Sequence, residues 1–436
     1  MIHLDTKLVS LLEWIHNTQD EKLKPSSYSY ISPKLEVRDV KGSGRGIYTN
    51  GHLNKSELVI RIPPSFLLNT TTVLSHISKY NTIASLSTSN IYTPFETIHD
   101  EFTKIYESLT KEELLDLSSF QLLGMYITIE TQRGKSSFWK PFLDMLPSIA
   151  DFELMPLVWQ INNQHDLLDL LPQPIRKTSE KVYTRFTSDY NTVTALLQTK
   201  IDNTEAVLPL DQFLLAWICI NSRCLYMNLP TSKSASDNFT MAPYVDFLNH
   251  SPNDHCTLKI DGRGFQVFST CAYSENEQVY LSYGPHSNDF LLCEYGFTIS
   301  DNKWNDLDVT EYLRPLFTSE QKRFLKEHDY WGNYTVNKEG ISFRTEVALA
   351  VLQENTPTES RKLMGLINGI TDGVVFKLKS DILLKTILNK VIHEAEQYKH
   401  LEFNNETDLV TRERKKVIGG LYNDRVTIAT NVLSNL

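Results

Sequence analysis

Two short segments carry the side chains whose types and spacing could do chemistry. The first is an apolar run that ends in a polar pair, Asp246-Phe247-Leu248-Asn249-His250. The second is Leu281-Ser282-Tyr283-Gly284, and another Tyr-Gly dipeptide follows at Tyr295-Gly296-Phe297. Buried polar groups need hydrogen-bonding partners, so an apolar run that ends in Asn-His is expected to present two polar side chains to a pocket. The two tyrosines, on either side of a short polar loop, can converge on the same pocket.

The same residues leave two other kinds of site open. His250, His255 and Cys256 could ligate a metal ion, but a loop with Pro252 separates the histidines, and neither a suitably spaced fourth ligand nor a His-Glu-x-x-His helix is present. A cysteine–histidine hydrolase would need a cysteine on a sharp turn before a helix, which the sequence does not show. Both alternatives are weaker than the pocket, and we expect no bound metal.

The elements that must position these side chains are short strands on either side of a helical region. Residues 58–62 predict a strand that ends at Pro63, and strands are expected again over 258–269, around the turn at Asp261 to Gly264, and over 278–282. Between them, apolar residues recur at helical spacing over 120–132 and 180–200, and Asp211 is in position to cap a third helix. Helical patterns return after Trp304, over 320–328, 345–353, 360–370, 381–398 and 411–436.

Composition narrows the class of protein. With 41% hydrophobic and 22% charged residues the chain is that of a folded protein, and 436 residues suggest more than one domain. The net charge of −10 argues against a direct nucleic-acid partner, which would select a basic surface. It is compatible with a basic protein partner, but could equally serve only to keep the protein in solution. Five cysteines without a Cys-x-x-Cys pair favour a reducing compartment. Residues 1–16 lack a signal-peptide pattern and no apolar run could span a membrane, so we expect a cytoplasmic or nuclear protein without a membrane partner.

Three further motifs are ambiguous when each is taken alone. The turn Gly42-Ser43-Gly44-Arg45-Gly46 could bring a backbone close to a ligand, but a strand follows it, so it is neither a dinucleotide fingerprint nor a P-loop and could be a plain hairpin turn. Arg223 ends an apolar helix, where its guanidinium could face a carboxylate. The aromatic stretch from Ser137 to Leu146 is expected to be core packing.

Taken in order, these motifs resemble the SET-domain protein methyltransferases, in the branch related to the Rubisco large-subunit lysine methyltransferase. The resemblance covers roughly residues 30–300 and is carried by Gly-Arg-Gly at 44–46, Ser-x-Trp-x-Pro at 137–141, Ser-Arg at 222–223, Asp-x-x-Asn-His at 246–250, Ser-Tyr-Gly-x-x-Ser-Asn at 282–288 and Tyr-Gly-Phe at 295–297. The helical tail resembles the substrate-binding domain of these enzymes in composition and position only. Histone-directed SET proteins have a zinc-holding, cysteine-rich tail, but no cysteine-rich segment follows Phe297 here. This difference argues against a nucleosomal substrate.

The resemblance implies an α+β fold and a function. The fold would be a SET domain over 1–300, with a β-rich core at 30–95 and 215–300 and a helical insert at 96–214, followed by an all-α substrate-binding domain at 301–436. The function would be S-adenosyl-L-methionine-dependent methylation of a lysine in a non-histone protein. The relatives that are most similar in layout act on ribosomal proteins or translation elongation factors, so the substrate is expected in one of these classes. The tail would then serve substrate recognition and not chemistry.

The resemblance also assigns the site. Tyr283 and Tyr295 would be catalytic, because transfer of a methyl group to an amine needs a neutral amine, an aligned lone pair and the exclusion of water, and tyrosine hydroxyls can orient the amine. The cofactor would contact Gly44, Arg45, Gly46, Glu57, Leu58, Val59, Arg223, Asp246, Asn249, His250, Tyr283 and Phe297. One related enzyme methylates histidine and replaces the second tyrosine, so Tyr295 favours lysine here. A histidine methyltransferase and a non-catalytic module on the same fold stay as alternatives.

Overall fold

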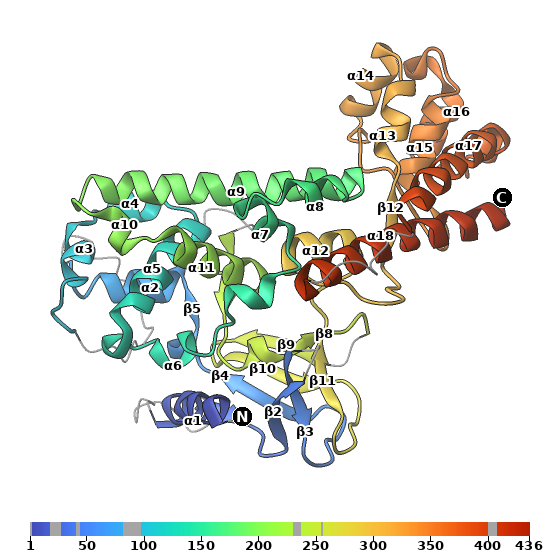
Figure 1. Cartoon of the computed structure of the whole chain (residues 1–436). Helices are drawn as coiled ribbons and strands as arrows, with labels where there is room; N and C mark the ends of the chain where they lie inside the picture. The colour runs from blue at the N-terminus through green and yellow to red at the C-terminus, as the bar shows by residue number, and fades with distance from the viewer. Residues whose placement is uncertain are drawn as a thin grey trace. The chain divides into compact units, whose positions relative to one another are not determined.

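The computed structural model describes residues 2–17, 28–40, 44–81, 97–229, 237–253, 256–399 and 408–436. The chain forms two compact units, Met1–Asp151 with Val182–Gly284 and Phe152–Lys181 with Pro285–Leu436, whose elements are labelled in Figure 1. Compact units of a fold need not coincide with the domains of a family, so the limits 1–300 and 301–436 stay a prediction. In the part of the chain that the structure describes, no helix is long and apolar enough to cross a membrane.

The first unit contains the strands that carry the candidate site. Within its described residues they form three small sheets, in the orders β1-β4-β10-β9, β2-β3-β11-β8 and β5-β7-β6. The strands are β1 (Tyr30–Ile31), β2 (Leu35–Val40), β3 (Gly44–Thr49), β4 (Leu58–Ile62), β5 (Leu68–Asn69), β6 (Leu225–Tyr226), β7 (Phe239–Met241), β8 (Asn249–His250), β9 (Cys256–Asp261), β10 (Gly264–Ser269) and β11 (Gln278–Leu281). In the second sheet β8 pairs in parallel with β11, which places Asn249 opposite Tyr280 and His250 opposite Leu281.

The hairpin predicted around Asp261 to Gly264 is confirmed, because β9 and β10 pair antiparallel from that turn. Gly264 has φ +91, and a Cβ there would lie 2.0 Å from the carbonyl oxygen of Ile62 on the neighbouring strand β4. This position therefore requires glycine for two reasons, its backbone conformation and the close approach of β4. The strand predicted at 58–62 is also confirmed, and Pro63 follows it directly.

The first unit also contains helices, several of them within the range 96–214 predicted for the insert. They are α1 (Ile2–Asn17), α2 (Thr70–Ile77), α3 (Thr103–Ser108), α4 (Lys111–Asp116), α5 (Ser119–Arg133), α6 (Lys140–Leu143), α10 (Thr204–Val207) and α11 (Leu210–Arg223), with α9 (Gln173–Gln198) divided between the two units. The prediction that Asp211 caps a helix was wrong. Helix α11 begins at Leu210 with Pro209 as its N-cap, so Asp211 lies in the first turn, where its charge favours the positive end of the helix dipole.

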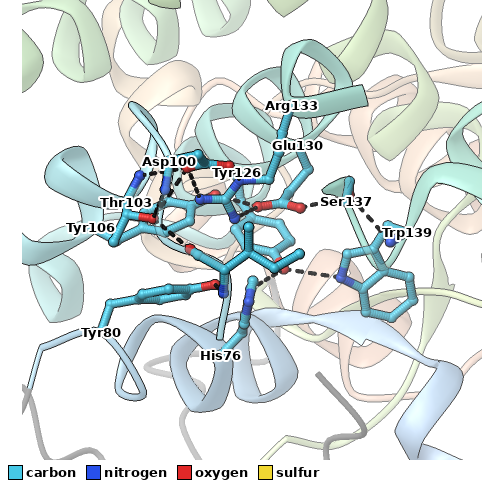
Figure 2. A network of polar contacts seen from close by, with 11 residues as sticks. His76, Tyr80, Asp100, Thr103, Tyr106, Tyr126, Glu130, Arg133, Ser137 and Trp139 are labelled. Atoms are coloured by element: carbon cyan, nitrogen blue, oxygen red, sulfur yellow. Dashed lines mark hydrogen bonds and ion pairs between the residues drawn. The ribbon is translucent and has the colours of Figure 1, made fainter. Parts of the chain in front are cut away.

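A buried polar network fixes helix α5 within the insert (Figure 2). The Glu130 carboxylate accepts hydrogen bonds from the Tyr106 hydroxyl at 2.8 Å, the Ser137 hydroxyl at 2.6 Å and the Arg133 guanidinium at 2.9 Å. Arg133 also pairs with Asp100 at 2.8 Å. Because Glu130 and Arg133 are both almost fully buried, each charge depends on the other for its stabilisation.

The same network includes the aromatic motif that follows α5. The indole of Trp139 donates to the Tyr126 hydroxyl oxygen at 3.0 Å, and that hydroxyl lies 2.6 Å from Nδ1 of His76. An indole N–H can only donate, so the Tyr126 oxygen is an acceptor for Trp139. Burial lowers the pKa of His76 to about 3, so its ring is neutral and shares a hydrogen bond with the Tyr126 hydroxyl. Trp139 is 1% exposed, and the prediction that this motif is core packing is confirmed.

The second unit is mainly helical. Its region after Trp304 is helical as predicted, but a small sheet in that region contradicts the prediction that 301–436 is all-α. Its helices are α7 (Pro156–Ile161), α8 (His165–Asp169), α12 (Asn288–Tyr295), α13 (Thr310–Leu313), α14 (Ser319–Glu327), α15 (Phe343–Val351), α16 (Arg361–Ile367), α17 (Val374–Lys399) and α18 (Leu409–Asn435). The sheet has the order β12-β13-β14, with β12 at Asp306–Asp308, β13 at Thr335–Asn337 and β14 at Gly340–Ile341. Strands this short offer too few residues for an alternating pattern to show in the sequence.

Candidate active site

Tyr283 is held beside His250 where β11 and β8 end. The Tyr283 backbone N–H donates to Nδ1 of His250 at 3.0 Å, and the Tyr283 hydroxyl donates to the carbonyl oxygen of Leu248 at 2.7 Å. The two rings lie with centroids 5.0 Å apart. Because the hydroxyl proton is directed to Leu248, the phenol oxygen keeps its lone pairs as acceptors. Because Nδ1 of His250 accepts a hydrogen bond, the neutral imidazole carries its proton on Nε2.

Asn249 connects β8 to the glycine-rich strand β3. Its side-chain amide donates to the backbone carbonyl of Arg45 at 3.1 Å. A Cβ at Gly46 would lie 2.3 Å from Nε2 of Gln278 and 2.8 Å from Nδ2 of Asn249, so glycine at this position lets both amides approach the strand. Gly44 opens β3 with φ +69, a conformation that favours glycine. The glycine motif is therefore part of a hairpin, β2–β3, and also a packing surface for Asn249. Gly42 and Ser43 lie outside the described residues.

Three charged side chains, those of Arg45, Arg223 and Asp246, come from the segments next to Asn249 and His250. Arg223 donates through Nη1 to the backbone carbonyl of Asp246 at 3.0 Å and to its carboxylate at 3.3 Å, so the expectation that Arg223 faces a carboxylate is confirmed. The Arg45 guanidinium donates to the Met145 carbonyl and lies over the Phe247 ring, 5.1 Å from its centroid. The side chain of Asp246 is only 1% exposed. Burial raises the pKa of the Asp246 carboxyl, and the positive charges of Arg223 and Arg45 oppose that shift.

These charged groups are incompletely satisfied by the protein. Among the described residues, Nε of Arg45, Nε of Arg223 and Oδ1 of Asp246 are buried and have no hydrogen-bond partner. Unsatisfied buried groups are uncommon in folded proteins and call for a ligand or an ordered water. Two cationic donors and one anionic acceptor can together hold a small group that carries both a carboxylate and an ammonium.

Glu57, Leu58 and Val59 lie elsewhere in the first unit, at the start of β4 in the other four-stranded sheet. The Glu57 carboxylate accepts from Lys34 at 2.7 Å and from the Asn54 backbone N–H at 2.9 Å. The pKa of Glu57 is lowered by the Asn54 backbone hydrogen bond and then by Lys34. The carboxylate of Glu57 therefore stabilises a turn, and a cofactor contact from this segment would have to come from its other atoms. The cofactor role of the three residues stays a prediction.

Tyr295 and Phe297 belong to the second unit. Tyr295 is the last residue of α12, and Gly296 caps the helix in a left-handed conformation with φ +81. The Tyr295 ring lies 6.1 Å from Phe297, 6.3 Å from Phe290 and 6.3 Å from His286, measured between centroids. The two residues therefore form one aromatic cluster, and the catalytic role of Tyr295 and the cofactor role of Phe297 stay predictions.

The structure adds residues to the site that the sequence did not single out. Tyr244, directly before the Val245–Phe247 turn, is buried and has φ +70, which is strained for a residue with a side chain. Such strain concentrates where a functional loop is held in place, and no sequence pattern signals it. Gln278 packs against Gly46 and accepts from the hydroxyls of Tyr48 and Tyr280 at 3.1 and 2.7 Å. Gln278 and Tyr280 are two residues apart on β11 and therefore lie on the same face of the strand. This spacing was the only sign in the sequence that Gln278 belongs to the site.

The structure also bears on the two alternative sites. Among the described residues, no group of three or more His, Cys, Asp or Glu side chains could hold a metal ion, and His255 lies outside them. Burial raises the pKa of the Cys256 thiol to about 11. A thiol with a raised pKa is a poor nucleophile at neutral pH, which weakens the cysteine–histidine hydrolase alternative.

Known protein families match most of the chain, including the strands that carry the candidate site. The SET domain family matches residues 44–284, and a family described as the ribosomal lysine N-methyltransferase 2 C-terminal domain matches residues 305–435. Ribosomal lysine N-methyltransferase 2 of Saccharomyces cerevisiae is 32% identical over 88% of this chain and 90% of its own length. Ribosomal lysine N-methyltransferase set11 of Schizosaccharomyces pombe is 27% identical over 86% of this chain and 87% of its own length.

A more distant relative and a solved structure extend the comparison. SET domain-containing protein 4 of Mus musculus is 25% identical over 88% of this chain and 84% of its own length. The crystal structure of the SET domain of LSMT bound to lysine and AdoHcy has the same fold, with a TM-score of 0.58 and 14% identity over 99% of this chain and 91% of that chain. The chain therefore belongs to the SET-domain protein lysine methyltransferases, in the branch that contains ribosomal lysine N-methyltransferase 2.

Proposed function

We propose that this protein transfers a methyl group from S-adenosyl-L-methionine to the side-chain amine of a lysine in a ribosomal protein. The observation that carries the proposal is the position of Tyr283, which is held against Leu248 and His250 at the end of the strands matched by the SET family. A phenol oxygen whose proton is donated elsewhere can accept a hydrogen bond from an amine. The overall match to ribosomal lysine N-methyltransferase 2 supports the substrate class.

The charged residues of the site fit the amino-acid end of this cofactor. Its carboxylate would find donors in the unsatisfied Nε atoms of Arg45 and Arg223, and its ammonium would find an acceptor in Oδ1 of Asp246. Asn249 and His250 would hold the cofactor from β8, where Asn249 also fixes the backbone of Arg45. When bound, the cofactor would supply a methyl group on a positively charged sulfur. The lysine amine would attack this methyl carbon in line, S-adenosylhomocysteine would leave as a neutral thioether, and the positive charge would pass to the methylated amine.

Tyr283 would orient the amine for that displacement. Its oxygen would accept an N–H of the neutral lysine amine, because its own proton is already directed to Leu248. This geometry makes the hydroxyl a positioning acceptor and not a proton donor. Tyr295, with its neighbours Phe290 and Phe297, would add aromatic faces that suit a cationic product.

A ribosomal protein suits the charge of this chain. Proteins that bind RNA are basic, and this protein has a net charge of −10, so the long-range attraction between the two is favourable. The match at residues 305–435 to the C-terminal domain of a ribosomal lysine methyltransferase supports a dedicated surface for such a partner. A translation factor is the alternative substrate. The cytoplasmic location and the absence of direct nucleic-acid and membrane contacts stay predictions.

The substrate class can be tested with ribosomes from cells that lack this protein. We expect the purified enzyme and methyl-labelled S-adenosylmethionine to label one ribosomal protein, and acid hydrolysis of that protein to release methyl-lysine. Ribosomes from cells that contain the enzyme are the control and should accept little label. Label in a translation factor would change the substrate class. Release of methyl-histidine, or cofactor binding without transfer to any protein of the lysate, would contradict lysine methylation.

Substitution of Asn249 by alanine is expected to weaken cofactor binding. The change removes the amide that fixes the Arg45 carbonyl, so the dissociation constant should rise by an amount equivalent to about 1–3 kcal/mol, the usual effect of an unpaired buried group. Titration calorimetry with S-adenosylhomocysteine measures it. Asn50→Ala, an exposed asparagine that directly follows β3, is the matched control and should bind normally. Normal affinity in a folded Asn249→Ala variant would remove Asn249 from the cofactor site.

A further inference from the structure

A buried cluster of amide and carboxylate groups joins helix α12 to the C-terminal helix α18. Asn288 opens α12 and is 3% exposed. Its side-chain amide donates to the carboxylate of Asp424, on α18, at 2.8 Å and to the backbone carbonyl of Ile299 at 2.9 Å. Its carbonyl oxygen accepts the Ile299 backbone N–H at 3.0 Å. One side chain thus fixes both backbone groups of a residue that lies just beyond Phe297.

Two more asparagines complete this cluster. Asn305 accepts the backbone N–H of Asn288 at 3.0 Å, which satisfies a donor at the start of α12, and donates to Asp424 at 2.7 Å. Asn302 donates to the backbone carbonyl of His286 at 2.9 Å and to the side chain of Asn288 at 3.2 Å. The Oδ2 atom of Asp424 therefore accepts from two buried amides and is the shared acceptor on which the cluster depends.

The residue next to Asp424 makes a second connection between the same helices. Arg425 donates from its two terminal nitrogens to the two oxygens of Asp289, at 3.2 and 2.6 Å, and it is 5% exposed. A two-bonded pair of this kind fixes direction as well as distance. Consecutive residues of α18 therefore hold consecutive residues in the first turn of α12.

The aromatic cluster lies between the anchored points. Helix α12 has eight residues, which is about two turns, so a first turn fixed by Asp424 and Arg425 also determines where its last residue, Tyr295, is placed. Phe297 follows Gly296 and precedes the anchored Ile299. The segment from Tyr295 to Phe297 is thus fixed on both sides by contacts that lead to Asp424.

We propose that Asp424 is a positioning residue for the methyl transfer, acting through Asn288 and Asn305 to place Tyr295. The proposal rests on the proposed function, in which Tyr295 has a catalytic role. It departs from the expectation that the region after Trp304 serves substrate recognition and not chemistry, because that region would also support the chemistry. Asp424 itself would contact neither substrate nor cofactor.

A double-mutant cycle in the full-length enzyme tests the proposal. Asp424→Ala is expected to lower kcat on the intact ribosomal substrate by on the order of tenfold to a hundredfold, because displacement of a group that orients a reactant has effects of this size. Asp424→Asn keeps an oxygen acceptor for both amides and should retain most of the activity. In a Tyr295→Ala background, which removes the ring that Asp424 places, Asp424→Ala should produce little further loss, because residues that act as a unit are not additive.

A second measurement does not depend on activity. Hydrogen exchange followed by mass spectrometry should show faster exchange in peptides that cover 293–299 of Asp424→Ala. Ile428→Val, on the same helix, removes one buried methylene from the core without touching the cluster and should leave both exchange and kcat unchanged. Unchanged exchange in Asp424→Ala, or losses that add fully in the double variant, would overturn the proposal. If the wild-type enzyme transferred no methyl group, the proposed function would fail, and the exchange result would still decide the anchoring.

Discussion

Tyr283→Phe is expected to lower turnover about 10²- to 10³-fold while cofactor affinity stays close to that of the wild type. One well-placed hydrogen bond to a reacting group has an effect of this size on rate. The hydroxyl would act on the amine and on the transition state, so its loss should appear in kcat more than in ground-state binding. Single-turnover rates and cofactor titration on both proteins measure the two quantities separately.

The structure adds a second expected effect of the same substitution. Phenylalanine removes the donor to the Leu248 carbonyl, so the free energy of unfolding should fall by about 0.5–1.5 kcal/mol. Tyr226→Phe, at a tyrosine that is 62% exposed, is the matched control. It should change neither the turnover nor the free energy of unfolding. A Tyr283→Phe variant with near-normal turnover would show that Tyr283 is structural, and the catalytic assignment would move to Tyr295.

Glu130→Ala is expected to have the largest effect on stability, with a loss of about 3–5 kcal/mol in the free energy of unfolding. The change removes the acceptor shared by Tyr106, Ser137 and Arg133 and leaves the Arg133 guanidinium buried with only Asp100 as a charged partner (Figure 2). Urea denaturation followed by circular dichroism measures the effect.

The control for this prediction is Glu112→Ala, which removes an exposed carboxylate from α4 in the same insert. An exposed charge contributes little, so a change below about 1 kcal/mol is expected. Equal unfolding free energies for the two variants would mean that the network around Glu130 does not stabilise the insert. Loss of folding altogether in Glu130→Ala would agree with the prediction and would be visible in the same measurement.

The sequence by itself determined the local elements that carry the site. The strand at 58–62 ends before Pro63, the hairpin turns between Asp261 and Gly264, and apolar spacing marks the helix over 119–133. Each of these follows from a preference of a few neighbouring residues, for backbone conformation or for burial of one face. The order of the short motifs along the chain was enough to indicate the family and its cofactor.

Tertiary structure alone decided which side chains meet. Asn249 reaches the Arg45 carbonyl, Arg223 meets Asp246, and Asp424 meets Asn288, in each case across a long stretch of chain. The prediction that Asp211 caps α11 was wrong for a local reason, since the N-cap is Pro209, two residues earlier. Contacts between distant segments depend on how sheets and helices pack, and no local preference encodes that packing. For this reason the residue types of the site could be predicted from sequence, while the hydroxyl held by Leu248, the strained Tyr244 and the Asp424 cluster became visible only in the fold.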